Sequence, residues 1–345
     1  MSRHRSSLVA TLLLVLFQIA AAPKPDDEIP PRLDAAVSNA LGFLARQQAA
    51  DGSFENNGPK VATTSLCLLS FLSTGHVPDL GKYGLTVRSA VDWLTTQQAP
   101  DGYFGAGEHG MYTHAIATLA LAQEYGVETN AARRIKLHTS LEKAVGVILA
   151  AQSTPKSSAV FAGGWRYERN SPDSDLSLSG WNVLALRAAR DAGINVPAEA
   201  RQRALAFVLH CWDDGAKAFA YQPGSGAQPG DTAIAILCLH LLDGTDAHPA
   251  KLSGAVKYLQ AHPVEENASY VYYATYYVVQ ASYQQGPDLY GRLGRSSFER
   301  LIRTQEKDGG WPVGKSGQEP GRVYATAMAV QTLAVPFRLL PVYQR

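Results

Sequence analysis

Two kinds of helical segment alternate along this chain. Six segments are apolar around nearly their whole circumference and carry few charges; they span residues 61–72, 111–125, 176–192, 232–242, 271–283 and 323–335. The segment before each of them has a charged face, with residues such as Arg88, Lys143, Arg201 and Arg300. An all-apolar helix is buried, whereas a helix with a charged face lies at the surface. The pattern therefore predicts six helical hairpins, each pairing an outer helix with an inner one.

A turn motif follows the outer segments and repeats along the chain. Gln47-Gln48 leads to Asp51-Gly52-Ser53-Phe54, and the same order returns 50 residues later, from Gln97-Gln98 to Asp101-Gly102-Tyr103-Phe104. Weaker copies end in Gly163-Gly164-Trp165, in Asp214-Gly215 with Phe219, in a shortened form at Gln260, and in Asp308-Gly309-Gly310-Trp311. Glycine tolerates the positive φ of a turn, and a glutamine amide can bond the free backbone groups where a helix stops. We interpret the motif as a structural staple, with the aromatic ring filling the gap between neighbouring hairpins.

Six hairpins can stack into an open solenoid or close into a ring. An open array needs polar caps at both ends, but the last segment, residues 323–335, is apolar. This favours closure. We therefore predict an all-α fold, an α6/α6 toroid over residues 31–341, preceded by a linker at residues 22–30.

The first residues have the pattern of a secretory signal peptide. Arg3 and Arg5 precede an apolar run over residues 8–22, which is too short for a comfortable membrane span, and the run ends in small residues before Pro23. We expect residues 1–21 to be removed after Ala21, with an uncleaved N-terminal anchor as the alternative. Either form predicts an exported protein, periplasmic or extracellular.

Composition excludes some partners. The net charge is +1 and 46% of the residues are hydrophobic, so no electrostatic argument supports binding to nucleic acid or to an anionic membrane surface. The three cysteines, Cys67, Cys211 and Cys238, lie in apolar helical patterns. An odd number cannot all pair, and we expect three free buried thiols with no disulfide framework and no metal cluster.

The repeated turns resemble the QW repeats of squalene–hopene cyclases and the repeats of protein prenyltransferase β-subunits. The best copies are residues 97–104 and 305–311, and the resemblance extends over residues 31–341. A narrower resemblance, carried by residues 175–181, 270–277 and 340–345, is to exported single-toroid bacterial proteins that are considered terpene-cyclase-like. Both resemblances imply the toroid and a pocket for a hydrophobic ligand, and neither determines the reaction.

The prenyltransferase resemblance also implies roles for particular residues. His109, in the stretch Glu108-His109-Gly110-Met111-Tyr112-Thr113, and Arg169 match positions that bind the lipid diphosphate, and Asp175 matches a zinc ligand. Ser177 stands where the family has a cysteine ligand, and Asp231, before Thr232, stands where it has a histidine ligand. Zinc favours those softer ligands. We therefore expect no catalytic zinc, no cofactor and no protein prenylation.

The cyclase resemblance implies acid catalysis. Cyclases protonate an alkene with an Asp-x-Asp-Asp motif; Asp173 and Asp175 match two of its carboxylates, and Asp231-Thr232 resembles the end of the motif. Squalene cyclases carry two helical barrels, whereas this chain predicts one. A homodimer is one way to supply the second barrel.

In a toroid the inner helices are parallel, so their N-termini and positive dipole ends meet on one rim. Residues at these helix starts are Lys60, His109, Asp175, Asp231, Tyr270 and Arg322. We expect this rim to surround the mouth of an apolar pocket, with Asp173, Asp175 and Asp231 as catalytic candidates. The ligand-binding candidates are His109, Arg169, Tyr272, Tyr276, Trp181 and Arg322.

Structural roles compete with these. Asp175 and Asp231 each precede an apolar helix and are candidate N-caps; a capped carboxylate keeps a low pKa and is a poor acid, unless Asp173 or Asp231 crowds Asp175. Arg169 could pair with Glu168 or Asp173, His109 could be a turn residue, and the tyrosines of residues 270–277 could pack in the core. Of these tyrosines, Tyr272 and Tyr276 share one helix face.

Three functions remain open from the sequence. The first is acid-catalysed cyclisation or isomerisation of an isoprenoid, for which an exported enzyme would meet a neutral lipid. The second is a non-catalytic module that binds a hydrophobic ligand or a protein. The third is a polysaccharide lyase or hydrolase.

Overall fold

The computed structural model describes residues 31–340 and 344, except residues 56 and 106–109. The predicted signal peptide and linker and the candidate His109 lie outside these residues. No helix within the described ranges is long and apolar enough to cross a membrane.

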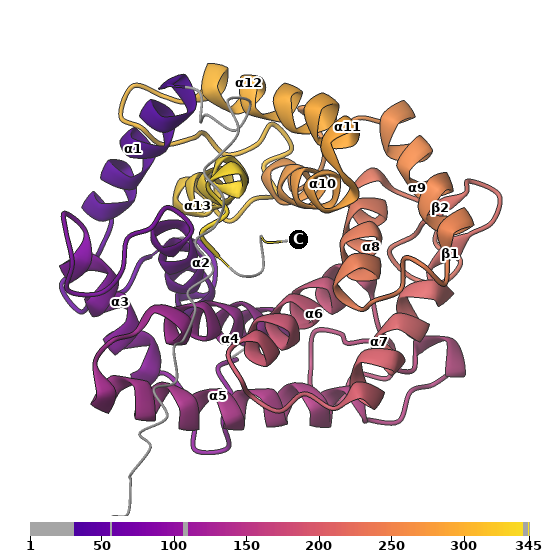
Figure 1. The fold of residues 1–345 in the computed structure, drawn as a ribbon, viewed down its shortest axis with the longest axis horizontal. Coiled ribbons are helices and arrows are strands. Elements are labelled where there is room, and N and C mark those ends of the chain that lie inside the picture. Colours follow the sequence, from indigo (N-terminus) through magenta and orange to yellow (C-terminus); the bar gives the residue numbers. More distant parts are fainter. Residues whose placement is uncertain (1–30, 56, 106–109, 341–343, 345) are drawn as a thin grey trace, which may run out of the picture.

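Twelve main helices of the described chain form two concentric layers (Figure 1). The inner layer consists of α2 (Lys60–Leu72), α4 (Gly110–Val127), α6 (Leu176–Asp191), α8 (Pro229–Leu241), α10 (Val271–Gln285) and α13 (Arg322–Leu333). The outer layer consists of α1 (Pro31–Arg46), α3 (Gly84–Thr96), α5 (Ala131–Gln152), α7 (Ala198–His210), α9 (Pro249–Ala261) and α12 (Arg295–Thr304). The six predicted inner segments therefore match the observed inner helices.

Short elements occupy the connections. These are the 3₁₀ turns η2 (Ala159–Phe161) and η4 (Val335–Phe337), the short helix α11 (Pro287–Leu289) with the π turn η3 (Tyr290–Gly294), and the strands β1 (Trp212–Asp213) and β2 (Ala218–Phe219). The two strands pair antiparallel, with Trp212 opposite Phe219.

The ring is closed. Each inner helix packs against the next, and α13 packs back against α2 and α1. Side chains bond across this closure: the Gln331 amide donates to the Leu66 carbonyl (3.2 Å) and the Ser70 hydroxyl to the Ala327 carbonyl (3.1 Å). The closed toroid is confirmed, and the open solenoid is excluded.

Glutamine side chains fasten neighbouring hairpins to one another. Each staple glutamine donates from Nε2 to the glycine carbonyl of its own turn and to a carbonyl of the next outer helix: Gln48 to Gly52 and Thr86, Gln98 to Gly102 and Ser140, Gln152 to Gly163 and Ala200, and Gln305 to Gly309 and Ala36, all at 2.8–3.0 Å. The last pair joins the end of the chain to its beginning. The structural interpretation of the motif is confirmed.

The turn glycines are required by both conformation and space. Gly309 has φ +91°, and a Cβ there would lie 2.3 Å from the Asn39 carbonyl oxygen. A left-handed backbone is costly for residues with a Cβ, and this close approach leaves no room for one. The outer helices can therefore come this near to the turns only where the turn residue is glycine.

A second set of hydrogen bonds ties each turn aromatic to its own inner helix. The backbone N–H of Phe54 donates to Thr64 (2.9 Å), that of Phe219 to Thr232 (3.1 Å) and that of Trp311 to Thr326 (3.0 Å). In the second hairpin His114 takes this place and accepts from Phe104 through Nδ1 (3.2 Å). Burial lowers the pKa of His114 to about 4, so it is a neutral structural residue.

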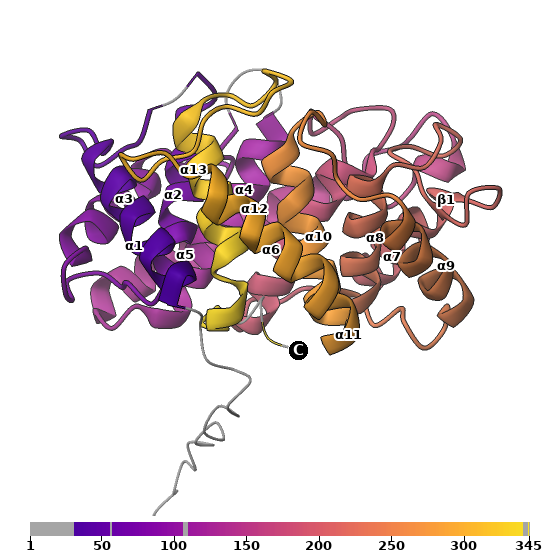
Figure 2. The same cartoon turned by 90° about the horizontal axis from the view of Figure 1, so that it is seen from above.

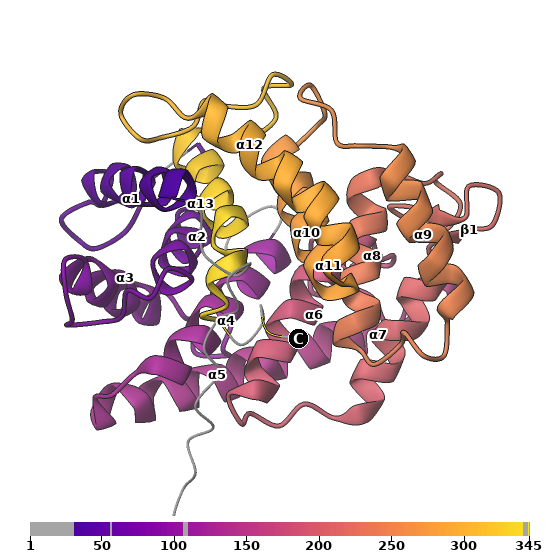
Figure 3. The ribbon, with the colours of Figure 1, turned by 45° about the horizontal axis from the view of Figure 1, so that its top comes forward.

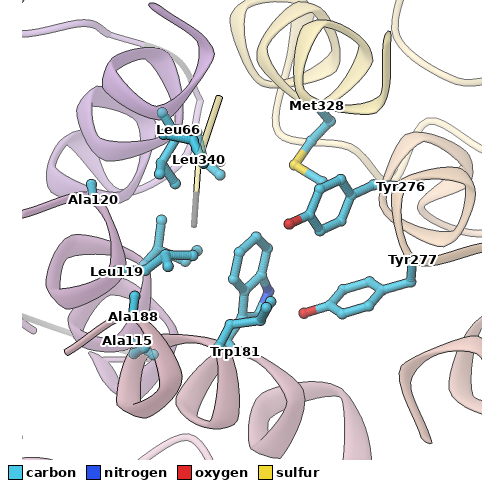
Figure 4. Close-up of a cluster of buried hydrophobic side chains, with 14 of the residues drawn as sticks. Leu66, Ala115, Leu119, Ala120, Trp181, Ala188, Tyr276, Tyr277, Met328 and Leu340 are labelled. Atoms are coloured by element: carbon cyan, nitrogen blue, oxygen red, sulfur yellow. The ribbon is translucent and has the colours of Figure 1, made fainter. Parts of the chain in front are cut away.

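The centre of the ring is packed with side chains (Figure 4). Trp181, Tyr276, Tyr277, Leu119 and Met328 are each at most 2% exposed. Leu340, beyond η4, is also buried among the inner helices. The apolar pocket expected along the axis is therefore filled by side chains at this depth. The inner helices begin at one rim of the ring, which Figure 2 shows from the side.

The three cysteines are free and buried, as the sequence predicted. Burial raises the pKa of each thiol, and a protonated buried thiol is chemically inert. We assign them to the core.

Candidate functional site

The inner helix α6 begins with a capping carboxylate on the rim. Asp175 accepts a hydrogen bond from the Leu178 backbone N–H at 2.7 Å, and its own N–H donates to the Trp165 carbonyl at 3.0 Å. Asp175 has no exposed surface. The predicted N-cap role of Asp175 is confirmed, and the backbone pairing with Trp165 places the next residue, Arg166, beside the carboxylate.

Arg166 holds the buried carboxylate in its charged form. Its Nη1 lies 2.7 Å from Asp175 Oδ2 and donates to the Tyr221 hydroxyl at 2.6 Å, while its Nε lies 3.3 Å from Asp173 Oδ2. The guanidinium also lies 4.4 Å above the Tyr167 ring. Burial disfavours the charge on Arg166, but the hydrogen bond and the charge of Asp175, with smaller contributions from its other neighbours, outweigh it and raise the pKa of Arg166.

Asp231 is the exception among the carboxylates of this rim. It lies in the first turn of α8, whose N-cap is Gln228, so it is not the cap that the sequence suggested. Asp231 makes no hydrogen bond and no ion pair within the described part of the chain, and it is only partly exposed. Burial, with a smaller contribution from the charge of Asp175, raises the pKa of Asp231 to about 7.

The two buried carboxyls are coupled, and their surroundings decide which carries the proton. Burial also raises the pKa of Asp175, but the Leu178 N–H and Arg166 oppose that effect. Asp231 has no such partners among the described residues. The contacts with Arg166 and the Leu178 N–H favour the charged form of Asp175, and no such contact favours the charged form of Asp231. Two carboxyls in such different surroundings suit the roles of an anion and a neighbouring acid.

Tyrosines form the wall beside these carboxyls. Ser177, in the first turn of α6, is hydrogen-bonded to Tyr112 of α4 and, at 2.9 Å, to Tyr273 of α10. Burial raises the pKa of both tyrosines, and Asp231 is close enough that its charge contributes to the shift at Tyr273. Both rings keep part of their surface exposed. We call these two partly exposed rings, together with the aromatic side chains beneath them, the rim cup.

The floor of this cup is aromatic. Trp181 stacks on Tyr276, with ring centroids 6.0 Å apart and planes 11° apart, and it meets Tyr277 edge-on at 5.8 Å. Tyr273 contacts both Trp181 and Tyr277. Trp181 and Tyr276, two of the predicted ligand-binding residues, are thus packed side chains with almost no exposed surface.

Two other predicted ligand residues are engaged away from the cup. Tyr272 donates to the Pro312 carbonyl at 2.8 Å, between α10 and the loop after α12, so it does not share the inward face of Tyr276. Arg322 pairs with Glu306 and, at 2.9 Å, with Asp308 of the last turn motif.

Arg169, a third predicted ligand residue, is also engaged elsewhere. It pairs with Asp101 at 2.7 Å and lies over Tyr103. Neither partner suggested by the sequence, Glu168 or Asp173, is the one observed. Like Arg322, this arginine links loops of the rim.

The central group therefore consists of Asp231, Asp175 and Asp173 with Arg166, and of the tyrosine wall. Sequence reasoning missed Arg166, because the family resemblance pointed to Arg169. One signal was available: Arg166 directly follows the aromatic of the Gly163-Gly164-Trp165 turn, and each turn aromatic is fixed to the inner helix that begins near it. Tyr112 and Ser177 lie in the stretches that carry the prenyltransferase resemblance but were given no role in ligand binding, and Tyr221 had no comparable signal.

Nothing in the described structure resembles a metal centre: residues 31–340, with their gaps at 56 and 106–109, hold no cluster of three or more His, Cys, Asp or Glu side chains that could bind a metal ion. Where the prenyltransferase resemblance implied zinc ligands, the structure places the carboxylates Asp175 and Asp231 and the hydroxyl of Ser177. The donors lack the thiolate and imidazole that zinc favours.

The fold can be compared with solved structures. No protein-family model matches the sequence, and no curated protein matches it. An α-1,6-mannanase of Salegentibacter sp. HEL1_6, in an inactive variant complexed with α-1,6-mannotriose, has a TM-score of 0.64 and 12% identity, covering 89% of this chain and 99% of the mannanase. The type II terpene cyclase MstE from Scytonema has a TM-score of 0.54 and 14% identity, covering 90% of this chain and 99% of the cyclase. Both similarities show the α/α toroid.

Proposed function

We propose that the rim cup binds a neutral isoprenoid lipid and that Asp231 starts its cyclisation or isomerisation by donating a proton. One observation carries the proposal: the Asp231 carboxyl, whose pKa burial raises to about 7, makes no side-chain hydrogen bond to the described residues and lies near Tyr273 of the tyrosine wall. An acid with a pKa near the working pH is the form that general acid catalysis requires.

The chemistry balances without a cofactor. The O–H bond of Asp231 breaks as a C–H bond forms at one carbon of a substrate double bond, which leaves a tertiary cation. A second double bond attacks that cation and closes a ring, or the cation loses a neighbouring proton directly. In either case a proton returns to the Asp231 carboxylate, so the product is an isomer of the substrate.

The surroundings fit a cationic intermediate. Tyr112 and Tyr273 have partly exposed rings at the rim cup, and the Tyr273 ring contacts that of Trp181. Aromatic faces stabilise cations by about 0.5–2 kcal/mol each, more when water is excluded. Ionised Asp175, held by Arg166, keeps the proton on Asp231 in the resting site and makes no direct contact with solvent. The similarity to a type II terpene cyclase is in keeping with this proposal, as is the secretory pattern of residues 1–21, from which we also propose export.

Glycoside hydrolysis is the second candidate. A protonated and an ionised carboxyl side by side are the pair that glycosidases use, and the mannanase has the higher fold similarity. Asp175 weighs against it, because a base or nucleophile must reach water or sugar, and Asp175 is fully buried and bonded to Arg166 and Leu178.

The experiment that separates these functions uses deuterium. The protein is incubated in D₂O with squalene, with a polyprenol and with α-1,6-linked mannan oligosaccharides, and the products are analysed by mass spectrometry. We expect an isoprenoid isomer that carries deuterium at the protonated carbon and is absent with Asp231→Asn. Shortened oligosaccharides would replace the proposal by the hydrolase, and unchanged substrates in every incubation would favour a non-catalytic binding module.

A further inference from the structure

We call the contact between the turn of one hairpin and the outer helix of the next a join. The join between the fifth hairpin (α9 and α10) and the sixth (α12 and α13) differs from the joins that a glutamine staple closes. Glutamine amides close the joins after α1, α3, α5 and α12. After α9 the chain continues as Gln260-Ala261-His262-Pro263-Val264, with no glycine–aromatic turn, and Gln260 is exposed. The turn aromatic, which fills the gap between neighbouring hairpins at the other joins, is therefore missing at this join.

The opposite side of the same join is also different. Five residues before the staple glutamines Gln48, Gln98 and Gln152 stand the apolar residues Phe43, Trp93 and Val147. Phe43, for example, packs on the turn glycine Gly310 of the preceding hairpin. Five residues before Gln305 stands Arg300. A cation thus replaces the apolar residue at the join that has no aromatic turn.

Arg300 takes over part of the missing contacts. Its Nη1 donates to the Val264 carbonyl at 2.8 Å, and its Nη2 donates to the Thr275 hydroxyl. Thr275 lies in the first turns of α10, as Thr64 and Thr326 do in α2 and α13, where they accept the backbone N–H of a turn aromatic. A guanidinium has five N–H donors, so these two bonds leave donors for a further acceptor.

A cavity remains around this arginine. It has a volume of about 220 Å³ and is lined by residues of α9, α10, η3, α12 and the loop after α9, among them Leu259, Val264, Val278, Leu293 and Arg300. A second cavity of about 90 Å³ adjoins it and shares Thr275 and Arg300. Cavities of ~150 Å³ with apolar walls hold a benzene molecule, so the larger one has room for a ligand of somewhat greater size.

The charge of Arg300 is not balanced by an ion pair in the described structure. The nearby carboxylate Glu266 is bonded instead to Arg303 at 3.1 Å and to Lys315 at 2.6 Å. Burial lowers the pKa of Arg300, with Glu266 opposing this from a distance. A half-buried cation without a charged partner is costly, and an anion in the cavity would relieve that cost.

We propose that this cavity is a binding site for a small organic carboxylate, whose anionic head pairs with Arg300 while its apolar body packs against Leu259, Val278 and Leu293. Arginine and carboxylate match in shape as well as charge, because the planar fork can donate two parallel hydrogen bonds. The site lies between α9, α10 and α12 on the outer side of α10 (Figure 3), whereas Tyr276 and Tyr277 of α10 point toward the centre of the ring (Figure 4). It is therefore independent of the rim chemistry.

Benzoate, cyclohexanecarboxylate and hexanoate are suitable probes, with benzamide as a neutral molecule of the same shape as benzoate. We expect saturable binding of at least one carboxylate to the full chain by calorimetry or saturation-transfer NMR, at least ten-fold tighter than that of benzamide. Leu293→Trp, which fills the cavity and leaves Arg300 in place, should abolish binding without unfolding the protein.

Arginine variants complete the test. Arg300→Met should lose the preference for carboxylate over benzamide, and Arg303→Met, which removes an exposed arginine of the same helix, should bind as the wild type does. The proposal fails if no carboxylate binds the folded wild type, or if binding survives in Leu293→Trp. The Leu293→Trp result keeps the test valid even if Arg300→Met does not fold, since Arg300 also bonds Val264 and Thr275.

Discussion

Each end of the inner ring of helices holds a largely buried carboxyl with a raised pKa. The two carboxyls differ in how far solvent can reach them. Asp231, in the first turn of α8, has a pKa of about 7, and Glu124, in the last turn of α4, has a pKa of about 8. In both, burial is the largest cause, and a neighbouring carboxylate (Asp175 or Glu128) adds to it. Neither carboxyl makes a hydrogen bond to another described residue.

Glu124 has no exposed surface, and Leu340 is buried among the inner helices, near Leu66 (Figure 4). Asp231 keeps part of its surface and borders the partly exposed Tyr273. A perturbed pKa by itself therefore shows only where a carboxyl is desolvated. A candidate acid also needs a path to a substrate, and by that criterion we propose the rim as the site and assign Glu124 to the core.

The largest expected effect is on activity at the rim. Asp231→Asn keeps size and polarity but has no proton to donate, so turnover of the substrate identified in D₂O should fall by about 10²–10⁴. Thermal stability should be unchanged or slightly higher, because a desolvated carboxyl is removed. A loss of activity that tracks a fall in melting temperature would instead make Asp231 a structural residue.

Substitutions in the rim turns allow an estimate of how much a purely structural change lowers the free energy of unfolding. Gly309→Ala combines strain at φ +91° with a Cβ 2.3 Å from the Asn39 carbonyl oxygen, so it should destabilise the fold by about 2–4 kcal/mol. Gly193→Ala is the matched control, since Gly193 has φ +85° and a Cβ there would meet no atom within 4 Å. It should cost only about 1–2 kcal/mol. Equal losses in urea unfolding would show that the turns are not closely packed.

Glu124→Gln should change stability with pH but not activity. In the wild type the folded state keeps the proton up to about pH 8, whereas the unfolded chain releases it at about pH 4.3. Between these values the folded state binds more protons, so stability falls as pH rises, by up to ~1.4 kcal/mol per pH unit. Glutamine removes this dependence. The free energy of unfolding of the variant, measured with urea, should therefore increase relative to that of the wild type as the pH rises through this range. Parallel curves for the two proteins would contradict the raised pKa.

The smallest effect, a shift in the pH dependence of activity, is expected when Asp175, the neighbour of Asp231, is substituted. Asp175→Asn keeps an N-cap but removes the charge that contributes to the raised pKa of Asp231. The pH above which activity is lost should move downward, yet stay above the ordinary range of an aspartate, because burial is the larger cause. Asp173→Asn, which alters a more exposed partner of Arg166, should move this limit less. An upward shift in Asp175→Asn would show that the two carboxyls are not coupled as described.

Much of the fold could be predicted from residue pattern alone. The six all-apolar segments became the inner helices, since a helix that is apolar on every side can only be buried. The copies of the turn motif at Gln48, Gln98, Gln152 and Gln305 became the staples, since glycine at positive φ and a glutamine amide at a helix end each have few alternatives, whereas the shortened copy at Gln260 did not. The packed centre was not predictable in the same way, because Trp181, Tyr276 and Leu340 meet across the ring from distant parts of the chain.

The candidate site, like the fold, has one part that local sequence predicts and another that only the tertiary structure decides. Local sequence is enough to predict that carboxylates open the inner helices and that Asp175 caps α6, because capping depends on residues three apart. It does not show that Arg166 rather than Arg169 pairs with Asp175, that Tyr272 and Arg322 are bonded away from the cup, or that Asp231 stands without a hydrogen-bond partner in the described structure. Those outcomes depend on which side chains from separate hairpins come within hydrogen-bond distance, and on the burial that shifts a pKa, and both arise only when the ring closes.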